Sequence, residues 1–215
     1  MFPFGIDIWT YVARILVVIL LLPAHELAHG YIAYKMGDPT AKNMGRLTLN
    51  PIKHIDPLGF LMLLFVGVGF AKPVPVNPNN FKNPKRDYAL VAAAGPIMNL
   101  LMGFVLMGLS LIVFLFVGST GNVLYIIQQV LMGMAVTSIA LAVFNLLPVP
   151  PLDGFNILGG FLPEKVYNTV MGYRNYIVPI FFVLIYFGFF DKVLFAAGDA
   201  IAGLFLQFYD FIGLI

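Results

Sequence analysis

The sequence contains no cysteine and few charged residues, and both features limit the classes of protein to which it can belong. Without cysteine it has no disulfide and no thiolate metal site. Only 10% of its residues are charged, against about 25% in soluble domains, and residues 88–152 contain no Asp, Glu, Lys or Arg. Because about 20 consecutive apolar residues cross the hydrocarbon core of a bilayer, these uncharged runs predict an integral membrane protein.

Other patterns are missing as well. The net charge of +2 gives no reason to expect a nucleic-acid partner. Strands that alternate apolar and polar residues are absent, which argues against an outer-membrane barrel. No Lys/Arg-rich leader precedes the first apolar run, so we expect this run to belong to the mature protein rather than to a signal peptide. We therefore expect one domain, residues 1–215, folded as an all-α polytopic membrane protein.

Hydropathy and helix-breaking residues predict a bundle of about four to six transmembrane helices. Residues 193–215 form either a last span or an interfacial helix, because Asp199 and Asp210 weaken the spanning interpretation. An apolar stretch of only 14 residues, 58–71, contains Gly67 and Gly69 and is short for a span. It predicts a re-entrant or β-hairpin-like segment between the first helix and the next one. The other expected helices are residues 8–34, 88–117, 123–147 and 175–190.

The basic residues predict the orientation. Residues 35–57 contain four Lys or Arg, residues 72–87 contain four, and residues 164–174 contain two, whereas the turn at 118–122 has none. By the positive-inside rule the three basic segments face the cytoplasm. The N-terminus and the turn then face the outside.

The first helix carries the motif AHELAHG at residues 24–30. His25 and His29 are four residues apart and share one helix face, and HExxH on a helix is a zinc motif in which the Glu, here Glu26, is the general base. The alternative is a set of buried polar side chains bonded to neighbouring helices. A charged residue at the bilayer centre costs at least about 2.5 kcal/mol, which favours a metal site.

The depth of this motif follows from helix geometry. If the cytoplasmic boundary lies near Lys35, His29 is about 9 Å and His25 about 15 Å inside the membrane, at ~1.5 Å per residue. Catalytic zinc usually has three protein ligands. The candidates for the third are His54, Asp56, Asp153 and Glu164. Asp153 ends the uncharged stretch at the same expected depth, although a helix N-cap remains an open alternative for it.

Three segments together resemble a known family. AHELAHG, AAAGPIMN (92–99) and FNLLPVPPLDG (144–154) are similar in sequence, order and spacing to the signatures of the site-2 proteases, which are intramembrane zinc metalloproteases. The resemblance covers about residues 10–160, which would form the catalytic core, with C-terminal helices at 175–215. It implies one zinc ion held by His25, His29 and Asp153, with Glu26 as acid and base.

The same resemblance implies the substrate class and the location. The family cleaves transmembrane proteins, which frees a regulator or clears a signal-peptide remnant. The loops LTLNPIKHIDPLG and GFAKPVPVNP resemble a compact prokaryotic branch without PDZ or CBS domains. We therefore expect a multi-pass protein of the plasma membrane with its active site near the cytoplasmic side. A membrane adaptor and a homo-oligomer both remain open.

Several further residues are candidates for the site. Asn145 is an oxyanion donor candidate, with an interhelical hydrogen bond as the alternative. Asn99 either holds the substrate backbone, as the resemblance implies, or forms a packing contact between helices. An extended edge within residues 67–76, with Gly67 and Gly69, would bind an unwound substrate by β-augmentation; a re-entrant plug is the alternative. His54 is a displaceable ligand, a substrate contact or a loop residue.

Two other functions use the same residue types. A metal transporter would also place His and Asp inside the membrane, but the sequence has no repeated halves of the kind that many transporters show. A non-catalytic binding protein that retains a protease fold would not need Glu26. The presence of Glu26 therefore favours an enzyme.

Overall fold

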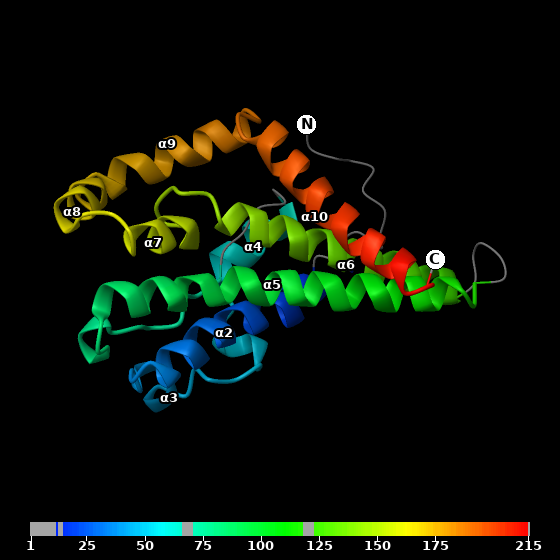
Figure 1. The fold of residues 1–215 in the computed structure, drawn as a ribbon, viewed down its shortest axis with the longest axis horizontal. Helices are drawn as coiled ribbons and strands as arrows, with labels where there is room; N and C mark the ends of the chain where they lie inside the picture. Colours follow the sequence, from blue (N-terminus) through cyan, green and yellow to red (C-terminus); the bar gives the residue numbers. More distant parts are fainter. Residues whose placement is uncertain (1–11, 13–14, 66–70, 118–122, 215) are drawn as a thin grey trace.

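The computed structural model describes residues 12, 15–65, 71–117 and 123–214, and this part of the chain is almost entirely helical (Figure 1). Its described residues contain no strand and only one isolated antiparallel bridge, between Ile55 and Ala71. The longer helices are α2 (Leu22–Lys35), α5 (Pro84–Phe114), α6 (Val123–Asn145), α9 (Arg174–Tyr186) and α10 (Asp191–Phe211). The shorter ones are η1 (Val17–Leu21), α3 (Thr40–Asn43), η2 (Pro51–Lys53), α4 (Pro57–Phe65), η3 (Pro78–Asn80), α7 (Asp153–Gly159) and α8 (Glu164–Gly172).

Within the described part of the chain, four helical stretches are long and apolar enough to cross a membrane: Val17–Lys35, α5, α6 and α10. A fifth is possible if α8 and α9, which meet at an angle of 70°, form one broken span. The structure therefore confirms the predicted all-α class, and its four or five candidate spans agree with the predicted four to six transmembrane helices. The predicted helix 175–190 corresponds to α9, which continues through Pro179, so the sharp bend lies at Tyr173.

Helix α5 is the central element and packs against both α2 and α6 (Figure 1). It begins at Pro84, four residues earlier than residue 88, where the uncharged run starts. Proline suits the first turn of a helix because the N–H it lacks would have no intrahelical partner there. The Asp87 side chain accepts a hydrogen bond of 3.0 Å from the Asn83 N–H, which closes the helix start.

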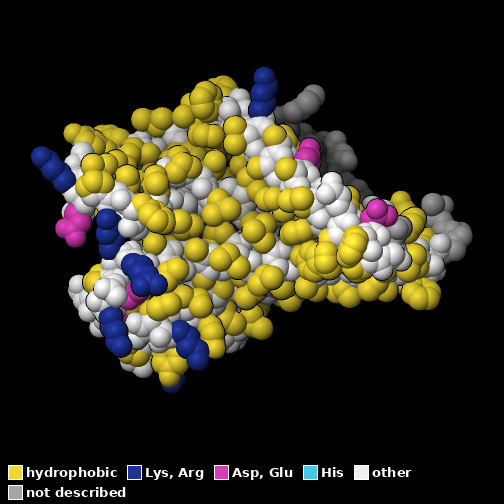
Figure 2. Space-filling model, in the orientation of Figure 1, with side chains coloured by type: hydrophobic (Ala, Val, Ile, Leu, Met, Phe, Trp, Pro, Cys, Tyr) yellow, Lys and Arg dark blue, Asp and Glu magenta, His cyan; other side chains and the backbone are white. Residues whose placement is uncertain are grey.

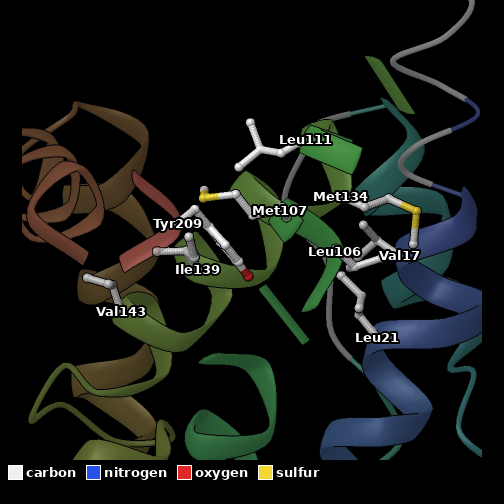
Figure 3. Packing of buried hydrophobic residues seen from close by; sticks show 10 residues of the cluster. Val17, Leu21, Leu106, Met107, Leu111, Met134, Ile139, Val143 and Tyr209 are labelled. Atoms are coloured by element: carbon white, nitrogen blue, oxygen red, sulfur yellow. The ribbon is translucent and has the colours of Figure 1, made fainter. Parts of the chain in front are cut away.

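The apolar core lies where α5, α6 and η1 meet, and its buried residues lie outside the AHELAHG motif (Figure 3). Leu106 lies there beside Val17 and Leu21, and Met107 and Ile139 lie beside Tyr209 in the same cluster. The close approach of α5 to α6 depends on glycine, since a Cβ at Gly103 would lie 2.8 Å from the Ile139 side chain.

Helix α10 packs against this core through partly buried residues such as Ile201 and Phe205, and through one buried residue. The Tyr209 hydroxyl donates a hydrogen bond to the Phe104 carbonyl, and Tyr209 is the buried residue of α10. The remaining faces of α10 are mostly exposed. Its length and hydropathy suit a span, so the first of the two interpretations of residues 193–215 has structural support.

The predicted re-entrant segment is only partly described. Its first half is helix α4, and the bridge between Ile55 and Ala71 brings the two ends of the segment together. Gly67 and Gly69 lie outside the described residues. The Lys and Arg side chains seen in Figure 2 gather mainly at the end of the molecule that carries α3, α8 and the start of α5.

Candidate metal centre

Two histidines of α2 and one aspartate of α7 converge on a single point. The Nε2 atoms of His25 and His29 are 3.0 Å apart. Oδ2 of Asp153 lies 3.2 Å from the first and 3.4 Å from the second. Zinc–nitrogen bonds of about 2.0–2.1 Å in a tetrahedral site place ligand atoms about 3.3 Å apart. The three atoms thus have the spacing of three corners of a zinc tetrahedron, which leaves the fourth position open.

Asp153 reaches this point because the chain stops being helical just before it. Helix α6 ends at Asn145, and α7 begins at Asp153 after an extended Leu152. The N-cap position of α7 is occupied by Leu152, so Asp153 is not the N-cap residue. The carboxylate of Asp153 faces the histidines instead. A Cβ at Gly154 would lie 2.5 Å from the Leu147 carbonyl oxygen, so the sharp turn after α6 requires glycine there.

The other three candidate ligands lie in different environments. His54 is buried, and its Nε2 pairs with the Thr48 carbonyl at 2.8 Å, so it holds the loop between α2 and α4. Asp56 accepts hydrogen bonds from the N–H groups of Leu58 and Gly59 and caps α4. Glu164 is an exposed residue in the first turn of α8. Among the described residues, only His25, His29 and Asp153 form a cluster of metal-ligand type.

The hydrogen bond of His29 Nδ1 determines which nitrogen of this ring carries the proton. Nδ1 of His29 lies 2.7 Å from the Val91 carbonyl, which only accepts, so Nδ1 carries the proton. Its Nε2 therefore presents a lone pair to His25 and Asp153. A backbone partner of this kind commonly orients metal-binding histidines. His25 is only 6% exposed, and its Nδ1 has no hydrogen-bond partner among the described residues.

Helix α5 supports the cluster through a glycine that sequence reasoning did not assign. A Cβ on Gly95 would collide with both imidazoles and would lie 2.5 Å from Cε1 of His25. Position 95 must therefore lack a side chain for α5 to lie against the two histidines. The signal for this was the run of small residues Ala92–Gly95 in the second family segment.

Glu26 lies next to the cluster in sequence and is 9% exposed. Its Oε2 accepts a hydrogen bond of 2.8 Å from the backbone N–H of Val74. Sequence reasoning did not assign Val74 individually, since a backbone donor leaves no mark in side-chain chemistry. The bond connects the acid/base candidate with a loop almost 50 residues away in the chain.

The two asparagine candidates differ in how they are satisfied. Asn99 on α5 is 1% exposed, and neither its amide nitrogen nor its amide oxygen has a partner among the described residues. Such an orphaned amide suits a ligand or a water molecule. Asn145 donates from Nδ2 to the Leu141 carbonyl at 2.9 Å, so one of its two N–H bonds remains for another acceptor.

A cavity of about 410 Å³ opens beside α7, between the start of α5 and α8. Asn156, which lies three residues after Asp153 on α7, forms part of its lining. At ~1.5 Å rise per residue it lies within a helical turn of the cluster. Other lining residues are Lys85, Tyr88, Glu164, Tyr167 and Asn168.

Comparisons with known proteins show a family match and relatives that are named as zinc metalloproteases. Residues 13–188 match the model of peptidase family M50. YwhC of Bacillus subtilis, named as a candidate zinc metalloprotease, is 41% identical over 178 residues, which cover 79% of this chain and 78% of YwhC. Rip2 of Mycolicibacterium smegmatis, which has the same type of name, is 31% identical over 158 residues, 69% of this chain and 58% of Rip2. No solved structure matches the chain significantly.

Proposed function

The chain belongs to peptidase family M50 and is a zinc metalloprotease, and from this premise we propose that it is an intramembrane endopeptidase. It hydrolyses a peptide bond in or near a transmembrane segment of a membrane protein, either to release a regulator or to clear a signal-peptide remnant. The observation that carries the proposal is the His25–His29–Asp153 cluster, whose two histidines lie on the helical stretch Val17–Lys35, which is itself long and apolar enough to span a membrane.

One zinc ion per chain fits the three ligand atoms, whose separations of 3.0, 3.2 and 3.4 Å match a tetrahedral site. When bound, zinc supplies a Lewis acid and lowers the pKa of water to about 7. Glu26 holds its carboxylate beside this point, accepts a proton from the attacking water and returns it to the leaving amine. The free N–H of Asn145 serves as donor to the oxyanion.

The proposed orientation places this chemistry near the cytoplasmic face. Helix α2 ends at Lys35, so His29 lies about 9 Å and His25 about 15 Å from that boundary at ~1.5 Å per residue. The basic side chains gathered at the same end of the molecule support a cytoplasmic assignment for that end (Figure 2). The N-terminus then lies on the extracytoplasmic side. The membrane is the plasma membrane of a prokaryote.

A transmembrane helix must unwind before its backbone can reach the site, and an extended edge within residues 67–76 would bind the unwound strand. Pro73 and Pro75 have no N–H, and the Val74 N–H is already bonded to Glu26. The donors for such pairing must therefore come from the rest of this edge. Asn99, whose amide has no partner among the described residues, is a second proposed contact for the substrate backbone.

Replacing Glu26 with glutamine tests the proposal, because the amide preserves the shape of the side chain and cannot take up the proton. We expect the Glu26→Gln protein to retain zinc and to lose cleavage. Uncut membrane proteins that accumulate in cells carrying this variant identify the substrate. A purified Glu26→Gln protein that cleaves such a substrate at the wild-type rate would refute the proposal. Zinc flux through liposomes that His25→Ala blocks would instead indicate a transporter.

A further inference from the structure

An extended segment, Lys72–Asn77, lies across the face of α2 that carries Glu26; we refer to it as the strap. At its beginning, the Lys72 N–H donates to the His54 carbonyl at 2.8 Å. The Lys72 carbonyl accepts a hydrogen bond of 2.7 Å from Nη2 of Arg46, whose side chain is buried. The strap is thus fixed at this end by two bonds to the loop that follows α2.

The other end of the strap is fixed by Asp38, just after the end of α2. Asp38 is 0% exposed. Its Oδ2 accepts a hydrogen bond of 2.7 Å from the Asn77 N–H, and its Oδ1 accepts one of 2.7 Å from the Asn80 side chain. The backbone and hydroxyl of Thr40 also donate to Oδ1. A buried carboxylate with four donors is an anchor that a neutral amide cannot reproduce, since one of its two atoms would then be a donor.

Between Lys72 and Val76, the strap presents a single backbone donor. The sequence there is Pro73–Val74–Pro75, and because proline has no N–H, only Val74 has one to offer. That N–H donates to Oε2 of Glu26 at 2.8 Å. The Val74 side chain is buried against Gly30 of α2, where a Cβ would lie 3.1 Å from Cγ1 of Val74. The backbone of the strap and its packing therefore both point the N–H at the carboxylate.

We propose that the strap positions Glu26 for proton transfer, with Val74 as the direct contact and Asp38 as a positioning residue that acts through the strap. This inference rests on the proposed role of Glu26. A glutamate side chain has several rotatable bonds, and a charge-assisted hydrogen bond to one oxygen fixes the whole carboxylate. With Oε2 engaged by Val74, Oε1 is the atom that exchanges the proton.

Replacing Val74 with proline tests the contact, because it removes the N–H and exchanges the valine side chain for a ring in a segment that is already proline-rich. We expect kcat on a substrate found with Glu26→Gln to fall about 10- to 100-fold, with KM and zinc content unchanged. Val74→Ala keeps the N–H and should lose much less. Wild-type kcat in Val74→Pro, or equal losses in the proline and alanine variants, would overturn the proposal.

Replacing Asp38 with asparagine tests the anchor without using a substrate. We expect amide hydrogen exchange at Val74 to accelerate in Asp38→Asn, while exchange in α2 and zinc content stay as in the wild type, and kcat to fall about 10-fold. Unchanged exchange at Val74 would show that Asp38 does not act through the strap. Activity in Glu26→Gln would contradict the proposed function itself, whereas an inactive Glu26→Gln with a fully active Val74→Pro would contradict only the positioning role.

Discussion

Gly95→Ala is the substitution whose effect on the metal centre follows most directly from the structure. The added Cβ would lie 2.5 Å from Cε1 of His25, whereas ordinary van der Waals contact begins near 3.4 Å. Helix α5 or the imidazoles must therefore shift by at least about 3.4 − 2.5 = 0.9 Å, because Nε2 of His29 would lie closer still. Because a displacement of about 1 Å at an active site can cost about 100-fold in rate, we expect kcat/KM to fall about 100-fold, or about 2.7 kcal/mol in transition-state stabilisation.

The assay combines zinc content and thermal unfolding with turnover. Gly95→Ala should bind zinc more weakly, and overpacking should lower the free energy of unfolding by about 1–3 kcal/mol. Gly103→Ala is a matched control on the same helix, because its Cβ meets Ile139 in the core and not the cluster. Gly198→Ala on α10 has no heavy atom within 4 Å of the added Cβ and should be neutral. Wild-type zinc affinity and turnover in Gly95→Ala would refute the predicted geometry.

Two further predictions concern Asp38 and Asn145. Burial raises the pKa of Asp38, but the hydrogen bonds it accepts from Thr40 and from the segment Asn77–Asn80 outweigh burial and hold the pKa below the ordinary 3.8. A lowered pKa stabilises the folded protein above pH 3.8 and loses this effect as the pH falls through the folded-state pKa, so the wild-type Tm should drop in this acid range. The drop should be smaller in Asp38→Asn; equal Tm–pH curves would contradict the assignment. Asn145→Ala should lower kcat about 100-fold with zinc retained, as for other oxyanion donors, and a kcat within threefold of the wild type would leave Asn145 only its bond to Leu141.

The local sequence alone was sufficient to predict the two histidines of the site. The spacing of His25 and His29 places both rings on one face of any helix, and the apolar composition of residues 8–34 predicts that this helix lies in the membrane. The number of spans was also predictable, because hydropathy over about 20 residues depends on composition and not on packing. The ends of the helices were less predictable. Helix α5 begins among the charged residues before the apolar run, where Pro84 and Asp87 form the first turn.

Only the tertiary structure decided which distant groups meet these two histidines. Residue chemistry permitted four third ligands, and the break after α6 brings Asp153 next to His25 and His29, whereas Asp56 caps α4 and His54 holds a loop. The run of small residues Ala92–Gly95 did not show that position 95 needs glycine, and the Val74 N–H on Glu26 left no mark in the sequence. One depends on how closely two helices approach and the other on a backbone atom. Periodicity and composition report on neighbours along a helix, and contacts between distant segments depend on how the whole chain packs.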